Sequence, residues 1–333
     1  MIATGVWAGL AESVFVGGVG ERERDPARLT MTLIGGVALG AIAATCGMIL
    51  VMVAYALFLG EGARGLEGLG DAGKALSDAR LNSPVLTVMR LITATAVDGV
   101  FLVVFVAFAA ALARQPLHVY VTAAAQIRWR LLAAGLLLSA AAMAPVVVAD
   151  RLLAGGGATA LPVLAVSSGA GERLAYVASS LLLLPAAAAE ELFFRGWLLR
   201  QASAFLRRPA ILIAATALTF STLHFDFNPD AFLTRALMGA GFAYMTLRLG
   251  GVEFSTGAHA VNNIVIVLFV QPLAFDAGAA SDMSALSLAE DAALIGGYVL
   301  ITELVARLPA LRRLAGVRLD EVSGGGGVTA PVS

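Results

Sequence analysis

Two adjacent glutamates, Glu190 and Glu191, lie inside a long apolar run, and Arg195 follows them one helical turn later. A carboxylate within a bilayer costs a few kcal/mol or more, so it usually pairs with another group or lines a functional cavity. Glu191 and Arg195 are spaced i, i+4 in the order that favours a helical ion pair. Glu190 points about 100° away on the same helix. We therefore predict a structural ion pair for Glu191 and a general base at Glu190.

Two of the three histidines also fall in apolar segments. His224 lies 17 residues after Arg207 (224 − 207), and Glu190 lies 17 residues before it (207 − 190). An antiparallel helical hairpin that turns at Arg207 places the two side chains at the same depth. On a later segment, His259 and Asn263 are spaced i, i+4 and share one helix face. An imidazole and an amide directed at one oxygen meet the requirement of an oxyanion hole.

The composition shows which elements must hold these residues. Of the 333 residues, 59% are hydrophobic and only 14% are charged, whereas about a quarter of the residues of an ordinary soluble domain are charged. Several apolar stretches exceed the ~18 residues that mark a membrane-spanning helix. The sequence therefore predicts an all-α, polytopic membrane bundle. The net charge of −1 argues against nucleic acid as a partner, and a single cysteine excludes an internal disulfide.

Eight membrane-spanning helices are predicted, at 31–59, 84–113, 129–150, 174–199, 209–224, 231–249, 253–272 and 288–308. Arginines cluster in alternate connections, which predicts that both termini face the cytoplasm. The excess of Arg over Lys and the abundance of Ala and Gly indicate a bacterial plasma membrane protein.

The same pattern divides the chain into five parts. We expect a cytoplasmic N-terminal segment at 1–30, N-terminal transmembrane helices at 31–173 and a catalytic transmembrane core at 174–272. The last transmembrane helix follows at 273–310, and the Gly-rich end at 311–333 is predicted to be a disordered cytoplasmic tail.

Three motifs on successive apolar segments resemble those of a known family. The sequence EELFFR at 190–195 fits EExxxR, residues 220–224 fit FxxxH, and residues 259–263 fit HxxxN. Their order and spacing resemble the type II CAAX prenyl endopeptidases, also called CPBP intramembrane proteases, over residues 174–270. The resemblance implies an intramembrane endopeptidase that acts on a membrane-associated peptide or protein.

The resemblance also implies a role for each matching residue. Glu190 and His224 would activate the attacking water, and His259 and Asn263 would stabilise the oxyanion. Glu191 and Arg195 would support the structure of the site. We interpret Phe220 as a packing residue under His224.

Alternatives remain open at this stage. A metal-free mechanism is favoured, but Glu190, His224 and His259 are also a legitimate set of zinc ligands. The same fold serves equally in a non-enzymatic membrane binding or immunity protein. A transporter would use Glu190, His224 and Asp98 as a proton relay, although no inverted repeat is apparent. The simplest interpretation of Asp98 is an ion pair with Arg90 or with Arg235.

Overall fold

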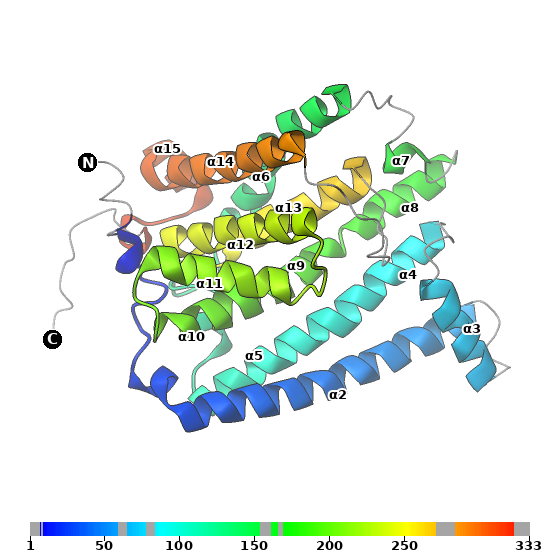
Figure 1. Ribbon diagram of the computed structural model, residues 1–333, viewed down its shortest axis with the longest axis horizontal. Helices are drawn as coiled ribbons and strands as arrows, with labels where there is room; N and C mark the ends of the chain where they lie inside the picture. Colours follow the sequence, from blue (N-terminus) through cyan, green and yellow to red (C-terminus); the bar gives the residue numbers. More distant parts are fainter. Residues whose placement is uncertain are drawn as a thin grey trace.

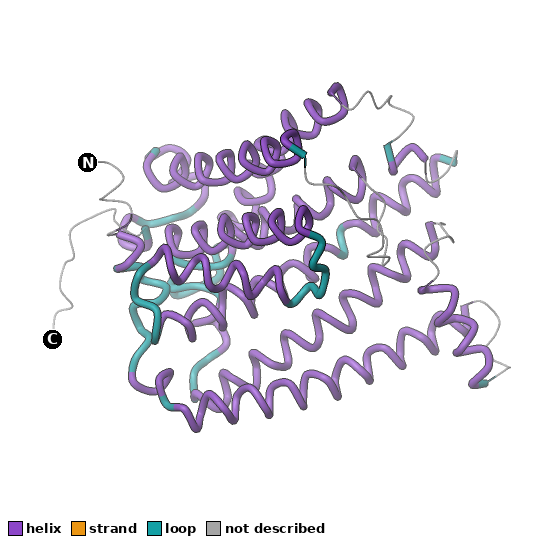
Figure 2. The backbone as a smooth tube through the Cα atoms, in the orientation of Figure 1, coloured by secondary structure: helices purple, strands orange, loops and turns teal. Residues whose placement is uncertain are grey.

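The computed structural model describes residues 7, 9–58, 65–77, 84–153, 161–165, 169–270 and 284–322. Within these residues helices dominate and no strand occurs; one isolated antiparallel bridge joins Thr122 to Gly251 (Figure 2). The predicted all-α membrane bundle is therefore confirmed.

Most of the helices run roughly parallel or antiparallel to one another (Figure 1). Their bounds are α2 Pro26–Phe58, α3 Leu66–Ser77, α4 Pro84–Ala94, α5 Val100–Ala113, α6 Trp129–Leu153, α7 Pro162–Ala165, α8 Ala170–Ser180, α9 Leu183–Glu191, α10 Leu199–Ser203, α11 Pro209–Thr222, α12 Pro229–Leu249, α13 Glu253–Val265, α14 Ala285–Arg307 and α15 Pro309–Ala315. Three π-helical segments join or extend them: η3 Thr95–Gly99, η6 Leu192–Leu198 and η7 Ile266–Val270.

Each of the eight predicted spans corresponds to a helix, but not all eight helices are both long and apolar enough to cross a membrane. In the described part of the chain, six helical runs are long and apolar enough to cross a membrane: Pro26–Phe58, Val88–Ala113, Trp129–Ala149, Ala170–Ser203, Glu253–Val270 and Ala285–Arg307. The apolar helix α11 has only 14 residues, fewer than the roughly 20 needed to span a bilayer. The helix α12 carries Asp230, Arg235 and Arg248, which lower its mean hydropathy.

The helix α13 lies at the centre of the bundle. It packs against α6, α9 and α12, and every residue from Glu253 to Asn262 is buried. In Figure 1, α2 and α5 run side by side below this centre and α14 lies above it. The sequence HAVNN is thus carried by the most enclosed helix of the fold, which fixes the position of its polar side chains.

Close contact between α6 and α13 depends on two glycines. A Cβ atom on Gly257 would fall on the carbonyl oxygen of Leu132, and one on Gly135 would fall on that of Phe254. Small residues let membrane helices approach to backbone contact, which gains dispersion energy where no hydrophobic effect operates between helices.

We expect Gly257→Ala to destabilise the protein by about 1–3 kcal/mol, because the added methyl must displace backbone atoms of α6. Thermal unfolding in detergent measures this loss. Gly296→Ala on α14 is the matched control, since a Cβ there meets no atom within 4 Å. Equal melting temperatures for the two variants would contradict the close-packing argument.

The predicted disorder of residues 311–333 is wrong for residues 311–322. The helix α15 extends to Ala315, a 3₁₀ turn follows at Leu319–Glu321, and Val317 and Val322 are buried. The remaining residues, 323–333, lie outside the described part. The ordered segment is held by a buried ionic cluster that sequence composition does not reveal.

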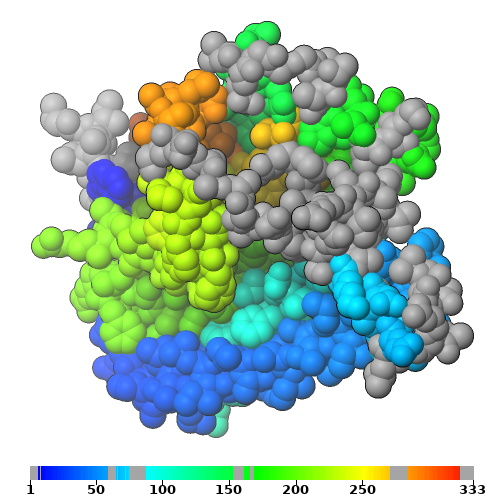
Figure 3. Space-filling model, turned by 45° about the vertical axis from the view of Figure 1, so that its right-hand side comes forward, coloured from blue at the N-terminus to red at the C-terminus, as the bar shows by residue number. Residues whose placement is uncertain are grey.

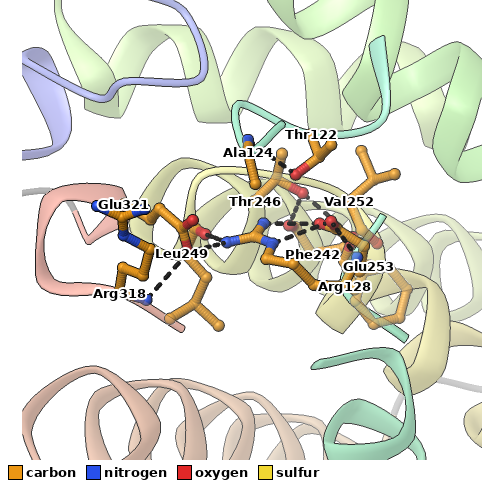
Figure 4. Close-up of polar contacts among 11 residues, drawn as sticks. Thr122, Ala124, Arg128, Phe242, Thr246, Leu249, Val252, Glu253, Arg318 and Glu321 are labelled. Atoms are coloured by element: carbon orange, nitrogen blue, oxygen red, sulfur yellow. Dashed lines mark hydrogen bonds and ion pairs between the residues drawn. The ribbon is translucent and has the colours of Figure 1, made fainter. Parts of the chain in front are cut away.

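That cluster joins three distant parts of the chain (Figure 4). Arg128 donates from Nε and Nη2 to the two carboxylate oxygens of Glu253, at 3.0 and 2.7 Å, and from Nη1 to Glu321, at 3.3 Å. Arg128 Nη1 also donates to the carbonyl of Leu249 at 2.8 Å. Because Glu253 is the first residue of α13, the cluster anchors the beginning of the helix that carries His259.

Candidate active site

The helix that carries the two glutamates changes its winding at the site. The helix α9 ends at Glu191, and the chain continues as the π-helical segment η6, which contains Arg195. Short π-helical segments interrupt the regular hydrogen-bond pattern and occur frequently at functional sites. Both η6 and α9 belong to a single long helical run in Figure 1, so Glu190 is placed by a continuous element.

The predicted Glu191–Arg195 ion pair is present. Arg195 Nη1 lies 2.8 Å from Glu191 Oε1, and both side chains are almost wholly buried. Arg195 Nη2 also donates to the carbonyl of Gly239 at 3.3 Å, and the guanidinium lies 4.3 Å from the centre of the Phe220 ring. The pair therefore links η6 to α11 and α12.

His259 lies between the two glutamates. Its Nδ1 is 3.0 Å from Glu191 Oε1, and its Nε2 is 3.7 Å from Glu190 Oε2. The Glu191 carboxylate only accepts hydrogen bonds, so Nδ1 carries a proton and Nε2 is directed at Glu190. The ring of Phe242 stacks on the imidazole, with 4.9 Å between ring centroids. The sequence placed His259 near Asn263 but did not indicate this bridging position.

Glu190 differs from its neighbour in both exposure and bonding. A quarter of its side chain is exposed, whereas that of Glu191 is fully buried. The contact with His259 is too long for a hydrogen bond. Among the described residues, no protein group hydrogen-bonds to the buried Oε2 atom of either glutamate, but Oε1 of Glu191 is bonded to Arg195 and His259, and Glu190 has no such partner. A buried acceptor without a partner requires an explanation, and an acceptor for a reacting proton is one.

His224 lies in the turn that follows α11. Its Nδ1 is 2.8 Å from the carbonyl oxygen of Phe220, which accepts its proton and leaves Nε2 as an acceptor. The predicted packing of Phe220 under His224 is confirmed, with ring centroids 4.7 Å apart. Phe220 also contacts His259, at 6.0 Å between centroids. His224 lies within electrostatic range of both Glu190 and His259.

Asn263 lies one turn beyond His259 on α13, with a half-buried side chain. Its Oδ1 accepts a hydrogen bond from Asn262 at 3.3 Å, which leaves its amide protons available to a ligand. Asn262 is held by the hydroxyl of Tyr298, also at 3.3 Å. Within the described part of the chain, the Asn263 side chain forms no hydrogen bond with the side chain of Glu190, His224 or His259.

The expected partners of Asp98 are wrong. Arg235 pairs with Asp226 at 2.9 Å. A hydrogen bond from the Asn228 backbone and the pairing with Arg235 lower the pKa of Asp226 below its usual range. No ion pair joins Asp98 to Arg90 or to any other base that the structure describes. Sequence spacing could not decide this, because Asp226 and Arg235 come together only through the turn between α11 and α12.

The candidate site opens to the surface. Figure 3 shows a hollow between the yellow-green α12 and the blue α2, with the cyan α5 at its floor. His224 and Asp98 are both exposed, and a quarter of the Glu190 side chain is exposed as well. Within the described residues, no group of three or more His, Cys, Asp or Glu side chains is arranged to hold a metal ion.

The fold and this site define a helical membrane protein whose buried glutamate and histidine side chains come from separate helices. Residues 172–265 match the family described as type II CAAX prenyl endopeptidase Rce1-like. The predicted resemblance is thereby confirmed, and it supports a CAAX-type intramembrane protease. The match ends before α14 and begins after α6, so it covers the helices that carry all three motifs.

A relative from Bacillus subtilis (strain 168), the uncharacterized protein YyaK, is 34% identical to this chain over 86 residues. The similar region covers 24% of this chain and 28% of that protein. No solved structure matches the chain. The expected division of the chain at 173 and 272 stays a prediction.

Proposed function

We propose that this protein is an intramembrane endopeptidase in which Glu190 and His224 activate the water that attacks a peptide bond. The observation that carries the proposal is the Glu190 carboxylate. Its Oε2 atom has no protein hydrogen-bond partner in the described residues, yet it faces His259 and lies within electrostatic range of His224. The family match to the same segment favours peptide hydrolysis over a structural role.

The geometry suggests an order of events. A water held by Glu190 and by Nε2 of His224 gives a proton to Glu190 as its oxygen attacks the scissile carbonyl. The resulting oxyanion accepts hydrogen bonds from Nε2–H of His259 and from the amide of Asn263. Glu190 then gives the proton to the leaving amine as the C–N bond breaks. One water is consumed: its OH stays on the new carboxyl group and its proton on the new amine.

Glu191 supports the oxyanion step through His259. For Nε2 to donate, the imidazole must carry protons on both nitrogens. The Glu191 carboxylate, 3.0 Å from Nδ1, stabilises that cation and fixes the orientation of the ring. Arg195 in turn fixes Glu191, so the predicted supporting residues act on the reaction through His259.

The proposal is metal-free, and the substrate is a membrane-associated peptide or protein segment that enters the bundle from the side. It places the protein in a bacterial plasma membrane with both termini in the cytoplasm. The described N-terminal and C-terminal elements lie at the same end of the bundle, which agrees with that orientation (Figure 1).

The decisive experiment is cleavage of a membrane-anchored peptide library in liposomes, with and without a strong chelator. We expect cleavage that survives the chelator and falls by about 10²-fold or more in His224→Gln, because the variant cannot hold and polarise the water. Loss of cleavage with the chelator would replace the metal-free mechanism by a zinc one. Full activity of His224→Gln would refute the role of that histidine.

A further inference from the structure

We propose that Asp98 is a specificity-determining residue of this site, and that it selects substrates with a basic side chain close to the scissile bond. The inference rests on the proposed peptidase function and adds a substrate preference to it. Asp98 lies outside the segment that matches the family, so the preference belongs to the N-terminal helices of this chain.

The first support is the position of Asp98. It belongs to the π-helical segment η3, which packs against α9. A Cβ atom on Gly99 would lie 3.6 Å from Cβ of Ala189, the residue that precedes Glu190. Thr95 Oγ1 donates to the carbonyl of Leu182, just before α9 begins, at 3.4 Å. These contacts place Asp98 beside Glu190, close enough for the two carboxylates to interact electrostatically.

The second support is access. The side chain of Asp98 is exposed in the bundle. The hollow in Figure 3 has α5, the direct continuation of η3, at its floor. The Glu190 side chain is itself a quarter exposed. A substrate segment that reaches Glu190 therefore comes close to Asp98, because η3 packs against α9.

The third support is the balance of charge. Two arginines close to the site are already paired with a carboxylate, Arg195 with Glu191 and Arg235 with Asp226. Glu190 interacts electrostatically with Arg195, His259 and His224, whereas Asp98 has no basic side-chain partner among the described residues. Two carboxylates surrounded by a low-dielectric bundle attract a cation more strongly than they would in water. A lysine or arginine of the substrate supplies that cation.

A purely structural role for Asp98 makes a different prediction. If the carboxylate only stabilised η3, its removal would lower the turnover of all substrates by the same factor. A charge-selecting role instead changes the ratio between a basic and an acidic substrate. The test is therefore the ratio, measured with peptides that differ at a single position.

The experiment uses three membrane-anchored peptides that carry Lys, norleucine or Glu at a position flanking the cut site. We expect the wild-type kcat/KM for the Lys peptide to exceed that for the Glu peptide by about tenfold or more, a difference of about 1.4 kcal/mol. In Asp98→Asn the ratio should fall close to one, and in Asp98→Glu it should be largely restored. Asp71→Asn, which alters a surface ion pair with Lys74, is the matched control and should keep the wild-type ratio.

An unchanged ratio in Asp98→Asn overturns the proposal, and so does an equal loss for all three peptides. A second arm separates this proposal from the proposed function. Uncleavable analogues of the three peptides, with an N-methylated amide next to the varied residue, are titrated against wild type and Asp98→Asn by fluorescence anisotropy. If wild type cleaves no peptide, the peptidase function fails, and the binding arm still decides the role of Asp98. Tighter binding of the Lys analogue by wild type, lost in Asp98→Asn, supports the selection of a basic side chain by Asp98. Equal affinities of wild type for the Lys and Glu analogues refute that selection.

Discussion

Glutamine in place of Glu190 is expected to reduce peptide cleavage by about 10²–10⁴-fold, which is the contribution typical of a general base. The amide has almost the same shape, but it cannot accept a proton from the attacking water. The site around it should persist, because no hydrogen bond from a described protein group depends on Oε2 of Glu190. The expected result is therefore a loss of kcat with an almost unchanged melting temperature.

Glu67→Gln is the control for this variant, because Glu67 is an exposed glutamate of α3, which lies at the C-terminal end of α2 (Figure 1). It should retain wild-type activity. Cleavage by Glu190→Gln at more than a tenth of the wild-type rate would remove Glu190 from the role of base. A large fall in its melting temperature would instead show that Glu190 is a structural residue.

Local spacing predicted the parts of the site that a single helix determines. The i, i+4 interval of Glu191 and Arg195 decides which of two adjacent glutamates is paired, because only one of them faces the arginine. The interval of Phe220 and His224 likewise placed one ring on the other. The apolar runs located the helices for the same reason, since hydropathy is a property of consecutive residues.

Contacts between helices were the parts that the sequence left undecided. The bridging position of His259 depends on how α13 packs against α9, and no interval within either helix encodes that packing. Asp98 was assigned a basic partner because intramembrane charges usually pair, yet the packing of η3 on α9 places it beside Glu190. The C-terminal segment appeared disordered because a run of glycines dominates its composition, whereas Glu321 is fixed by Arg128, which directly precedes α6.

Removal of the Arg195 guanidinium is expected to have the largest effect on stability. Arg195→Met leaves the fully buried Glu191 without its strongest partner, and a buried charge that loses its partner costs about 3–5 kcal/mol. The variant also loses the hydrogen bond to Gly239 and the cation–π contact with Phe220. Unfolding by titration with SDS in mixed micelles measures the change in free energy.

Two comparisons show whether the uncompensated charge is the cause. The double variant Glu191→Gln/Arg195→Met removes both charges, so it should recover a large part of the lost stability. Arg307→Met breaks another i, i+4 pair, with Glu303, but Arg307 is about half exposed and Glu303 keeps Arg248. That variant should lose no more than about 1 kcal/mol. If Arg195→Met is no less stable than the double variant, the uncompensated charge of Glu191 is not the cause of the lost stability. The pair would then stabilise the protein through packing and hydrogen bonds.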